Sequence, residues 1–193
     1  MVTQTQKQTY TPEEYLELEE KAEFRNEYRN GEIIPMAGGS TNHNKIAGNL
    51  YKRLPLTIQE QDYEVYIGDV KLWIPQNRTY TYPDIMVIQG EPIYQENRRD
   101  IITNPRLIVE VLSKSTQGYD QGDKFRSYRS IPSFQEYILI DQSSYHLEHS
   151  KQTENQWLFK EYEREDAVLR LESINLQIPL KDIYQRVNFD EPE

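Results

Sequence analysis

Cysteine is absent from all 193 residues of the sequence. Its absence excludes a disulfide framework and any zinc site built from thiolates. No stretch approaches the roughly 18 consecutive apolar residues of a membrane span, and the polar segment Met1–Thr9 lacks the apolar core of a secretory signal. These absences predict a cytoplasmic protein that does not contact a membrane.

Basic residues are scarce, with 22 Lys and Arg against 32 Asp and Glu and a net charge of −10. This balance argues against a general nucleic-acid coat, because affinity for DNA comes largely from neutralised phosphates. The charge is uneven, however. The segment Asn104–Ser130 holds five basic and three acidic residues, so it carries +2 and the remainder −12. The segment is either a local patch that binds a polyanion or a solvated helix face.

What is present suits one globular domain. Hydrophobic residues make up 36% and charged residues 28% of the chain, which is typical of a folded protein with a single core at this length. We predict a flexible N-terminus at 1–10, one domain at 11–187 and a flexible C-terminus at 188–193.

Local patterns in the first third predict a helix, a hairpin and a second helix. Thr11-Pro12-Glu13-Glu14 forms a capping box that opens the first helix. Asn30-Gly31 lies between two extended stretches of Phe24–Met36 and predicts a hairpin turn. After the link Gly38-Gly39-Ser40, the spacing of apolar residues predicts a helix over Asn42–Gln61, which Pro55 should kink or end early.

The rest of the chain alternates between strands and helices, which predicts a mixed α/β domain with a central sheet. Between the strands, Gln89–Asn104 is predicted as a loop, Ser113–Gly118 as a turn and Asp120–Ser130 as a helix. The predicted strands are Tyr63–Ile74 (one or two strands), Ile85–Ile88, Leu107–Leu112 and Tyr137–Asp141, then a meander of Tyr145–Glu148, Trp157–Tyr162 and Val168–Leu171 before a short helix at Lys181–Val187.

Glu110 is the most informative single residue. It lies within Leu107–Leu112, whose other members are all aliphatic, and on a strand it shares a face with Ile108 and Leu112. A lone ionised carboxylate in such a place costs several kcal/mol unless it is paired or binds a cation. The alternatives are a buried ion pair, a neutral hydrogen-bonded acid and a metal ligand.

Asp84 stands just before the apolar run Ile85–Ile88, directly after Pro83. It could be an ordinary loop residue. However, its strand and that of Glu110 can lie side by side, so that the two carboxylates converge on one point. Two hard oxygen ligands with open coordination positions suit Mg²⁺ or Mn²⁺. The pair therefore predicts a divalent-metal site.

Lys124 lies on the helix that follows the Glu110 strand. Asp120 and Lys124 are four residues apart and could form an exposed ion pair. Alternatively, Lys124 could point at the carboxylates, where it would orient an attacking water and stabilise charge on a phosphate.

The remaining histidines and the tryptophans give less information about function. His146 and His149 are three apart on a predicted strand and face opposite sides, which argues against a shared metal site. Trp73 and Trp157 are expected to be core or interface aromatics.

An ordered set of segments resembles the Uma-two family of restriction-type endonucleases, and the resemblance extends from about Thr11 to Val187. The segments that carry it are Asn26–Ile33, His43, Tyr82–Asp84, Ile108–Thr116, Asp120–Tyr128 and Glu136–Asp141. This family is placed in the PD-(D/E)XK superfamily, so the resemblance implies a restriction-endonuclease-like central mixed sheet flanked by helices, here extended by the C-terminal meander.

The resemblance also implies roles. Asp84 matches the first acid of the superfamily motif and Glu110 the second, both as metal ligands. The position two after Glu110 is Leu112 instead of lysine, as is usual in this family, and Lys124 matches the relocated lysine.

Glu27 and His43 match polar positions that line the family's pocket, although Glu27 could be a hairpin cross-strand partner and His43 could simply lie near or cap its helix. Basic residues of the positive segment are candidates for contact with nucleic acid: Lys114, Arg126 and Arg129.

The sequence therefore predicts a Mg²⁺- or Mn²⁺-dependent endonuclease that acts on nucleic acid, DNA foremost, and forms a homodimer. The rival prediction is a nuclease-like fold that serves as a binding or assembly module without turnover; the negative charge and Leu112 favour it. A third alternative is hydrolysis of another phosphate compound.

Overall fold

The computed structural model describes residues 8–54, 57–58, 61–113, 118 and 120–190. Along the chain the elements are α1 (Pro12–Glu19), β1 (Asn26–Arg29), β2 (Glu32–Pro35), α2 (Thr41–Tyr51), β3 (Thr57–Ile58), β4 (Gln61–Ile67), β5 (Lys71–Ile74), the 3₁₀ turn η1 (Pro75–Asn77), β6 (Thr79–Thr81), β7 (Ile85–Gln89), β8 (Ile101–Ile102), β9 (Leu107–Leu112), the π-helical turn η2 (Asp120–Lys124), α4 (Phe125–Tyr128), β10 (Glu136–Asp141), β11 (Leu147–Gln152), β12 (Trp157–Tyr162), β13 (Val168–Leu171), β14 (Leu176–Pro179) and α5 (Leu180–Ile183).

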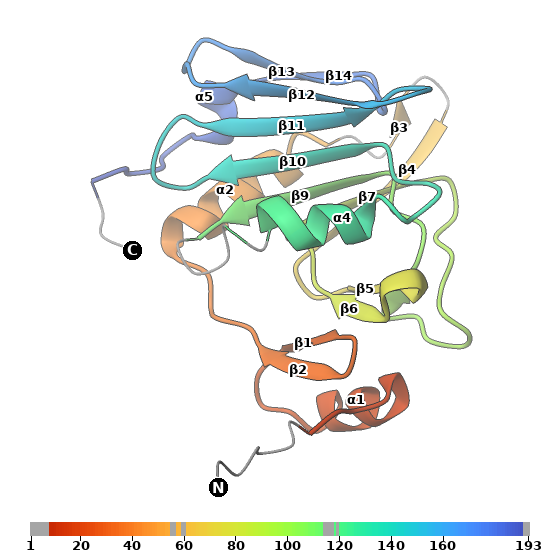
Figure 1. Cartoon of the computed structure of the whole chain (residues 1–193). Helices are drawn as coiled ribbons and strands as arrows, with labels where there is room; N and C mark the ends of the chain where they lie inside the picture. The colour runs from red at the N-terminus through yellow and green to blue at the C-terminus, as the bar shows by residue number, and fades with distance from the viewer. Residues whose placement is uncertain (1–7, 55–56, 59–60, 114–117, 119, 191–193) are drawn as a thin grey trace, which may run out of the picture.

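A seven-stranded mixed sheet forms the body, in the order β12-β11-β10-β9-β7-β4-β3. Only β9 and β10 are parallel neighbours in it, and η2 and α4 supply the crossover between them. Figure 1 shows α2 behind this sheet and α4 in front of β9. Side chains of α2, α5 and the β13–β14 hairpin fill a core on one face, while those of α4 and β5 join a core on the other.

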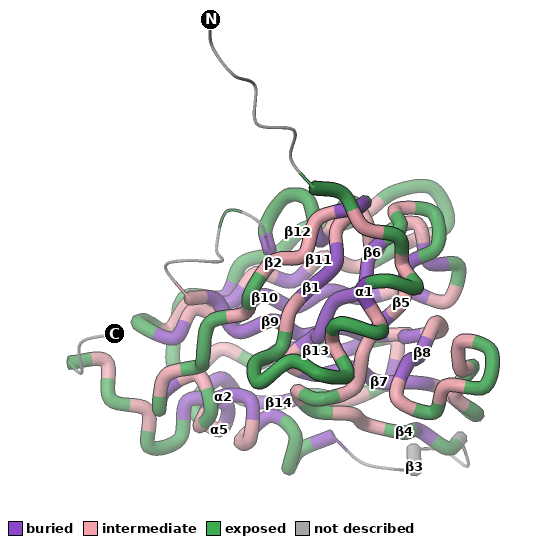
Figure 2. The backbone as a smooth tube through the Cα atoms, turned by 90° about the horizontal axis from the view of Figure 1, so that it is seen from below, coloured by how far each residue is buried: buried purple, intermediate pink, exposed green. Residues whose placement is uncertain are grey.

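β9 runs through the middle of this sheet and is buried along its whole length. Its alternate residues face the two cores: Leu107, Val109 and Val111 on one side, Ile108 and Leu112 on the other. The predicted strand covered on both faces is therefore correct. In Figure 2 the tube is buried along the central strands, and exposed segments follow the outer loops.

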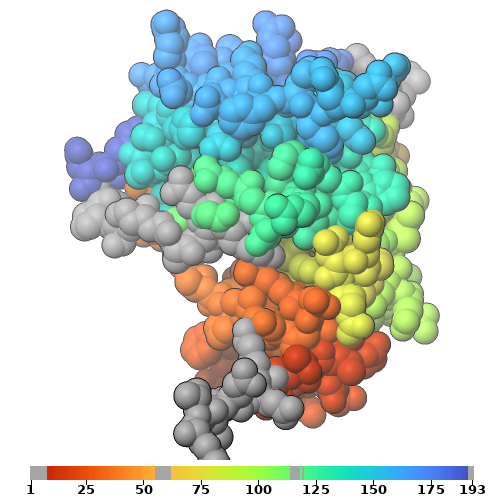
Figure 3. Space-filling view, viewed as in Figure 1, coloured from red at the N-terminus to blue at the C-terminus, as the bar shows by residue number. Residues whose placement is uncertain are grey.

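The N-terminal lobe comprises α1 and the β1–β2 hairpin, and it extends a second sheet of order β2-β1-β6-β5-β8. Its core is aromatic: Tyr15, Tyr28 and Tyr80 are fully buried and pack together, and Trp73 stacks on Tyr80. In the space-filling view the red and orange lobe forms the lower part of the molecule, opposite the blue C-terminal strands (Figure 3).

Local chemistry explains where the first elements start and turn. The Thr11 hydroxyl accepts from the Glu14 N–H at 3.1 Å, and the Glu14 carboxylate accepts from the Thr11 N–H at 2.7 Å, so the predicted capping box is formed. Asn30 and Gly31 have φ values of 45° and 102°, as a tight hairpin turn requires.

Three predicted elements are wrong in detail. α2 ends at Tyr51, well before the predicted Gln61, and Ser40 caps its start. β8 lies inside the stretch that we predicted as a loop. Val168–Leu171 does not join β12, because it pairs with β14 in a separate hairpin; the meander consists of β10, β11 and β12 instead.

The closing helix is α5, which begins and ends earlier than the predicted Lys181–Val187. Of the predicted turn Ser113–Gly118, residues 114–117 lie outside the described part of the chain, as do most of the predicted flexible N-terminus and residues 191–193. Among the described residues, no helix has both the length and the apolar character needed to cross a membrane.

Candidate active site

A cavity of about 450 Å³ lies between the N-terminal lobe and the seven-stranded sheet. The lobe contributes residues of β1 and the 34–39 segment, and the body contributes the start of α2, the approach to β7, the middle of β9 and η2. The five residues that we predicted as catalytic or pocket-lining all line it: Glu27, His43, Asp84, Glu110 and Lys124.

Asp84 and Glu110 enter this cavity from neighbouring strands. Ile85 of β7 pairs with Val109 of β9 in antiparallel register, so Asp84 and Glu110 occupy the next opposed positions and lie on the same side of the sheet. The Asp84 Oδ2 atom accepts the Val111 N–H at 2.7 Å. The two acids therefore approach one point from adjacent strands.

Glu110 is 3% exposed. Its Oε1 atom accepts a hydrogen bond from the Tyr128 hydroxyl at 2.6 Å and from the Lys124 ammonium at 3.0 Å. Burial raises the pKa of the Glu110 carboxyl to about 8; Lys124 opposes this rise, and the charges of Asp120 and Asp84 add to it. The positive charge of Lys124 is thus not enough to ionise this carboxyl at neutral pH.

Lys124 lies among three carboxylates. Its Nζ atom is 3.0 Å from Glu110, 3.1 Å from Asp120 and 3.4 Å from Glu27. Burial alone would lower the pKa of Lys124, but the three acids outweigh it and raise that pKa well above its ordinary value. The ammonium therefore stays charged inside the protein.

The Asp120–Lys124 pair differs from the exposed pair that we weighed from the sequence. Asp120 is 2% and Lys124 6% exposed. Although Asp120 Oδ1 is 3.1 Å from Nζ, it receives no hydrogen bond of good geometry from the described residues. A buried carboxylate oxygen without a donor costs free energy, so it is an orphaned acceptor facing a cluster of acids.

Glu27 reaches the site from the hairpin. One oxygen accepts from the Thr81 hydroxyl and the other from the Arg29 guanidinium. Burial would raise the pKa of Glu27, but Lys124 and Arg29 together lower it below its usual value. Glu27 is therefore an ionised wall of the cavity in addition to its place opposite Ile34 in the hairpin.

His43 lies in the first turn of α2, where the Ser40 hydroxyl accepts its N–H. Its Nε2 atom is 3.1 Å from Asp84 Oδ2. Burial would lower the pKa of His43, but the hydrogen bond and charge of Asp84 outweigh it, so the pKa is raised. His43 thus lies near the helix start and also holds one oxygen of Asp84.

The donor set fits a hard divalent cation. When all are ionised, the carboxylates of Glu27, Asp84, Glu110 and Asp120 exceed the charges of Lys124 and Arg29 by two. Carboxylate oxygens are the ligands that Mg²⁺ and Mn²⁺ prefer. In the described part of the chain, no three of these carboxylates have oxygens that all lie within 4.8 Å of one another, so an ion would contact at most two of them unless side chains move.

The candidates for nucleic-acid contact do not gather at the cavity. Arg126 and Arg129 are exposed on α4 and at its end and do not line it, and Arg126 pairs with Asp123. Lys114 lies outside the described residues. Their contact with nucleic acid stays a prediction.

Sequence reasoning missed several neighbours of the acids, namely Arg25, Arg29, Thr81 and Tyr128, and did not count Asp120 as part of the site. Arg25 and Arg29 line the cavity, whereas Thr81 and Tyr128 contact its acids Glu27 and Glu110. The one local signal was the spacing of Asp120 and Lys124, which does not reveal the π-helical turn that holds both.

The two strand histidines face opposite sides, as predicted. His149 is buried beside Glu136, 3.2 Å away, while His146 lies outward, 3.4 Å from Glu161. His146, Glu148 and Glu161 could together hold an ion. Trp73 and Trp157 pack against other aromatic rings, as expected.

The Uma2 family model, described as "Putative restriction endonuclease", matches residues 12–181. The chain belongs to the Uma2 family. The Uma2 membership that the sequence motifs predicted is thereby confirmed. Two relatives come from Synechocystis sp. (strain ATCC 27184 / PCC 6803 / Kazusa). The uncharacterized protein sll1609 is 48% identical over 81% of this chain and 89% of its own length. The uncharacterized protein slr1290 is 37% identical over 93% of both chains.

A solved structure shares the Uma2 fold. It is described as "a putative nuclease belonging to DUF820" from Anabaena variabilis ATCC 29413. The match has a TM-score of 0.74 at 20% identity and covers 91% of this chain and 97% of that one. At this identity the match speaks for the fold alone, and it confirms the predicted mixed α/β architecture.

Proposed function

We propose that this Uma2 protein is a divalent-metal-dependent endonuclease that hydrolyses phosphodiester bonds in nucleic acid, DNA foremost. One observation carries the proposal: Asp84 and Glu110 approach each other from adjacent strands in a cavity where the Lys124 ammonium lies 3.0 Å from Glu110. Two acids and a lysine in this arrangement are what phosphodiester hydrolysis with a hard cation needs.

Asp84 and Glu110 would hold the cation, while Asp120 Oδ1 lies 3.1 Å from the Lys124 ammonium in the same cavity. When bound, Mg²⁺ or Mn²⁺ supplies a Lewis acid that stabilises negative charge on a phosphate oxygen. Val111 and His43 both donate to Asp84 Oδ2 and so fix the orientation of that carboxylate. Lys124 can donate to a phosphate oxygen or to the attacking water. The Glu27 carboxylate lies 3.4 Å from the Lys124 ammonium and keeps that ammonium directed into the cavity.

Cleavage assays test the proposal directly. Plasmid and single-stranded DNA are incubated with Mg²⁺ and the wild-type protein, Asp84→Asn or Glu110→Gln. Glu161→Gln is the matched control, because it removes an exposed acid on β12 that does not line the cavity. We expect the control to cut like the wild type and the two cavity variants to lose activity. Equal cutting by all four proteins rules out these roles.

The rival proposal is a binding or assembly module without turnover. The net charge of −10 and the leucine at position 112 support it, while the ammonium of Lys124 beside Glu110 supports the nuclease. Calorimetric titration with Mg²⁺ or Mn²⁺ separates them. The titration should be done on Glu161→Gln, so that the His146, Glu148 and Glu161 group does not add a second signal. No heat of binding at millimolar metal favours the module.

A homodimer and a cytoplasmic location complete the proposal. The dimer rests on the family resemblance, and sedimentation equilibrium of the full chain tests it. Cell fractionation tests the location.

A further inference from the structure

Most of the acids of the cavity and its lysine are buried, although the Asp84 side chain is 20% exposed. Glu27 and Glu110 are each 3% exposed, Asp120 2% and Lys124 6%. A substrate phosphate reaches their side chains only by entering the cavity between the N-terminal lobe and the sheet. The form of the nucleic acid must therefore suit a partly enclosed site.

The cavity is small for a double helix. Its volume of about 450 Å³ lies in the range of about 300–1,000 Å³ that is typical of small-molecule pockets. A duplex is stiff and carries its phosphates along the outside of a wide rod. Enzymes that modify a base inside a closed pocket act on single strands or extrude one nucleotide from the stack. An unpaired strand, in contrast, can bend one phosphate inwards.

The charges of the cavity also favour an unpaired strand. Its described basic lining residues are Arg25, Arg29 and Lys124, in a protein of net charge −10. Duplex-binding proteins commonly neutralise about 6–10 phosphates along a basic surface. Three cations among the described lining residues could contact few phosphates, as for a short stretch of single strand.

Arg25 is the lining cation with the most exposed side chain, at 49%, against 28% for Arg29 and 8% for Lys124. Its acid partner, Asp69, is 2.7 Å away and 87% exposed, and such exposed pairs contribute little. Lys124 and Arg29, in contrast, are held by the buried carboxylate of Glu27. A phosphate can thus displace Asp69 from Arg25 at small cost.

Arg25 is also fixed beside the metal-ligand candidate Asp84. Its guanidinium donates to the Gly68 carbonyl at 3.0 Å, and the Gly68 N–H donates to the Asp84 carbonyl at 3.1 Å. The guanidinium lies 5.7 Å from the ring centre of Tyr82, another lining residue. Arg25 therefore lies two hydrogen bonds from the residue that would hold the cation.

We infer that the cavity accepts an unpaired nucleic-acid strand, either a single-stranded segment or an overhanging end, and that Arg25 binds the phosphate next to the one that is cleaved. The inference rests on the proposed nuclease function and names the substrate class of that site. Its physical basis is the enclosed acid cluster together with the exposed guanidinium beside it.

The first experiment compares three labelled DNAs of one sequence: a single strand, a blunt duplex and a duplex with a single-stranded overhang. Binding is measured by fluorescence anisotropy with Ca²⁺, and cleavage with Mg²⁺. The single strand and the overhang should bind about tenfold more tightly than the blunt duplex, and cuts should fall in unpaired DNA. Equal binding and cutting of the blunt duplex overturns the inference.

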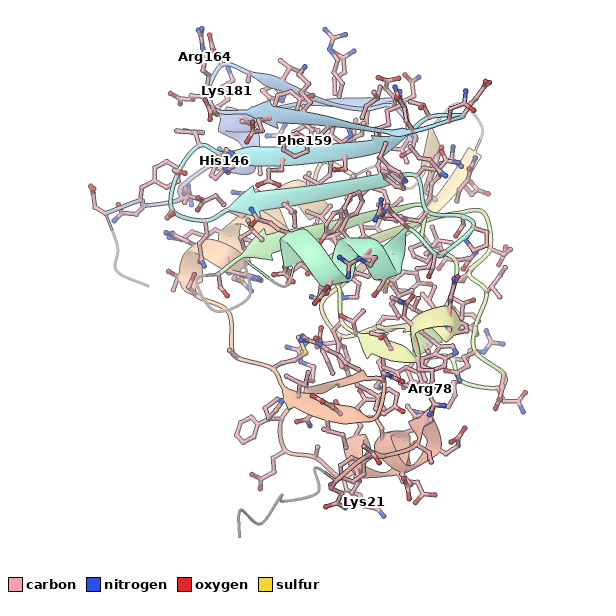
Figure 4. All side chains as sticks on the ribbon, viewed as in Figure 1. Lys21, Arg78, His146, Phe159, Arg164 and Lys181 are labelled. Atoms are coloured by element: carbon pink, nitrogen blue, oxygen red, sulfur yellow. The ribbon has the colours of Figure 1, made fainter. Side chains whose placement is uncertain are left out.

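The second experiment tests Arg25. Arg25→Ala should weaken binding of the single strand about tenfold and reduce the slope of log affinity against log salt concentration by about 0.7. Arg25→Lys, which keeps the charge, should retain part of the affinity. Arg164→Ala is the matched control, because Arg164 also pairs with an exposed aspartate, Asp166, and lies at the far end of the molecule from the lobe (Figure 4).

Calorimetric Mg²⁺ affinity and the thermal midpoint are measured for each variant, and neither should change. If Arg25→Ala binds the single strand like Arg164→Ala does, the role of Arg25 is overturned. If Mg²⁺ binds and none of the DNAs does, the substrate class is overturned while the metal site stands. If Mg²⁺ does not bind at all, the proposed function itself fails.

Discussion

Glu110 combines two opposing effects at one residue. Its strand neighbours are aliphatic and fully buried, so ionisation is costly. Lys124 and Tyr128 donate to one of its oxygens, which reduces that cost without cancelling it, because Asp120 and Asp84 add repulsion. A buried ion pair of this kind seldom stabilises a protein more than apolar residues would. The proposed cation would supply the positive charge that this carboxyl lacks.

The raised pKa of Glu110 predicts a dependence of stability on pH. Below pH 4.5 the carboxyl is protonated in both folded and unfolded chains, and between 4.5 and about 8 only the folded chain retains the proton. The contribution to the free energy of unfolding therefore falls as pH rises through this window. Glu110→Gln lacks this loss, so the difference between its urea midpoint and that of the wild type should shift in favour of the variant as pH rises from 4.5 to about 8. A constant difference would contradict the raised pKa.

Lys124 allows a second prediction at the same scale. Lys124→Met leaves the carboxylates of Glu27 and Asp120 without the ammonium that lies 3.4 and 3.1 Å from them, and removes a hydrogen-bond donor from Glu110. Uncompensated buried charge of this kind costs about 3–5 kcal/mol. We expect a loss of that size by urea denaturation at neutral pH, while Lys181→Met, at an exposed position of α5, should change stability little. Similar losses for both variants would mean that Lys124 contributes no more to stability than an exposed lysine does.

Single residues of the site could be predicted from the sequence only where the sequence pattern itself is unusual. Glu110 stands out because an acid interrupts an aliphatic strand, and Asp84 because it precedes another such strand. The placement of Lys124 came from family resemblance, since a spacing of four does not say which side of a helix meets the sheet. Arg25 could not be predicted, because only the tertiary fold brings it to Gly68.

At the scale of elements, residues of the β1–β2 hairpin line one part of the cavity and residues of α2 line another. The hairpin depends on its turn: Gly31 has a φ of 102°, which an L-residue with a side chain adopts only with strain. Gly48, in contrast, lies inside α2, and a Cβ there would meet no atom within 4 Å. The two glycines therefore respond differently to the same substitution.

Gly31→Ala should destabilise the protein by about 1–2 kcal/mol, because the alanine is strained at positive φ. Gly48→Ala should stabilise it by up to about 1 kcal/mol, because alanine is the better helix former. Urea denaturation of both variants gives the two signs directly. If Gly31→Ala were neutral, the turn geometry would be wrong.

The elements that the sequence predicted well are those with a strong local signal, such as the capped α1, the Asn-Gly hairpin and the aliphatic β9. The errors occur where the pairing partner of a strand determines whether the strand forms and which sheet it joins. β8 is two residues long and exists because β5 lies alongside it. Val168–Leu171 alternates as any half-buried strand does, and only the following turn at Asn175 directs it to β14 instead of β12.

At the scale of the whole molecule, the candidate site joins the N-terminal lobe to the body. Glu27 belongs to β1 and reaches Lys124 of η2 across the cavity at 3.4 Å. An ion at the acid cluster binds the folded arrangement only, because the unfolded chain does not bring these residues together. Metal binding is therefore linked to global stability.

Mg²⁺ should raise the thermal midpoint of the wild type. At a concentration about 100 times the dissociation constant, the gain in stability is about 2.7 kcal/mol. Asp84→Asn should lose most of this gain, whereas Glu161→Gln should retain it. Differential scanning calorimetry with and without Mg²⁺ measures the effect. An equal gain in Asp84→Asn would place the ion elsewhere.

The contact of Asp84 with the Val111 amide has a consequence for the shape of the sheet. β7 and β9 stay paired up to Ile85 and Val109, and at the next amide of β9 a side-chain oxygen takes the place of a backbone carbonyl. A side-chain carboxylate that accepts in place of a backbone carbonyl satisfies the N–H of the neighbouring strand at the point where the two strands separate. The separation of β7 and β9 and the orientation of Asp84 thus have a common origin, and a shift of β9 would also reorient that carboxylate.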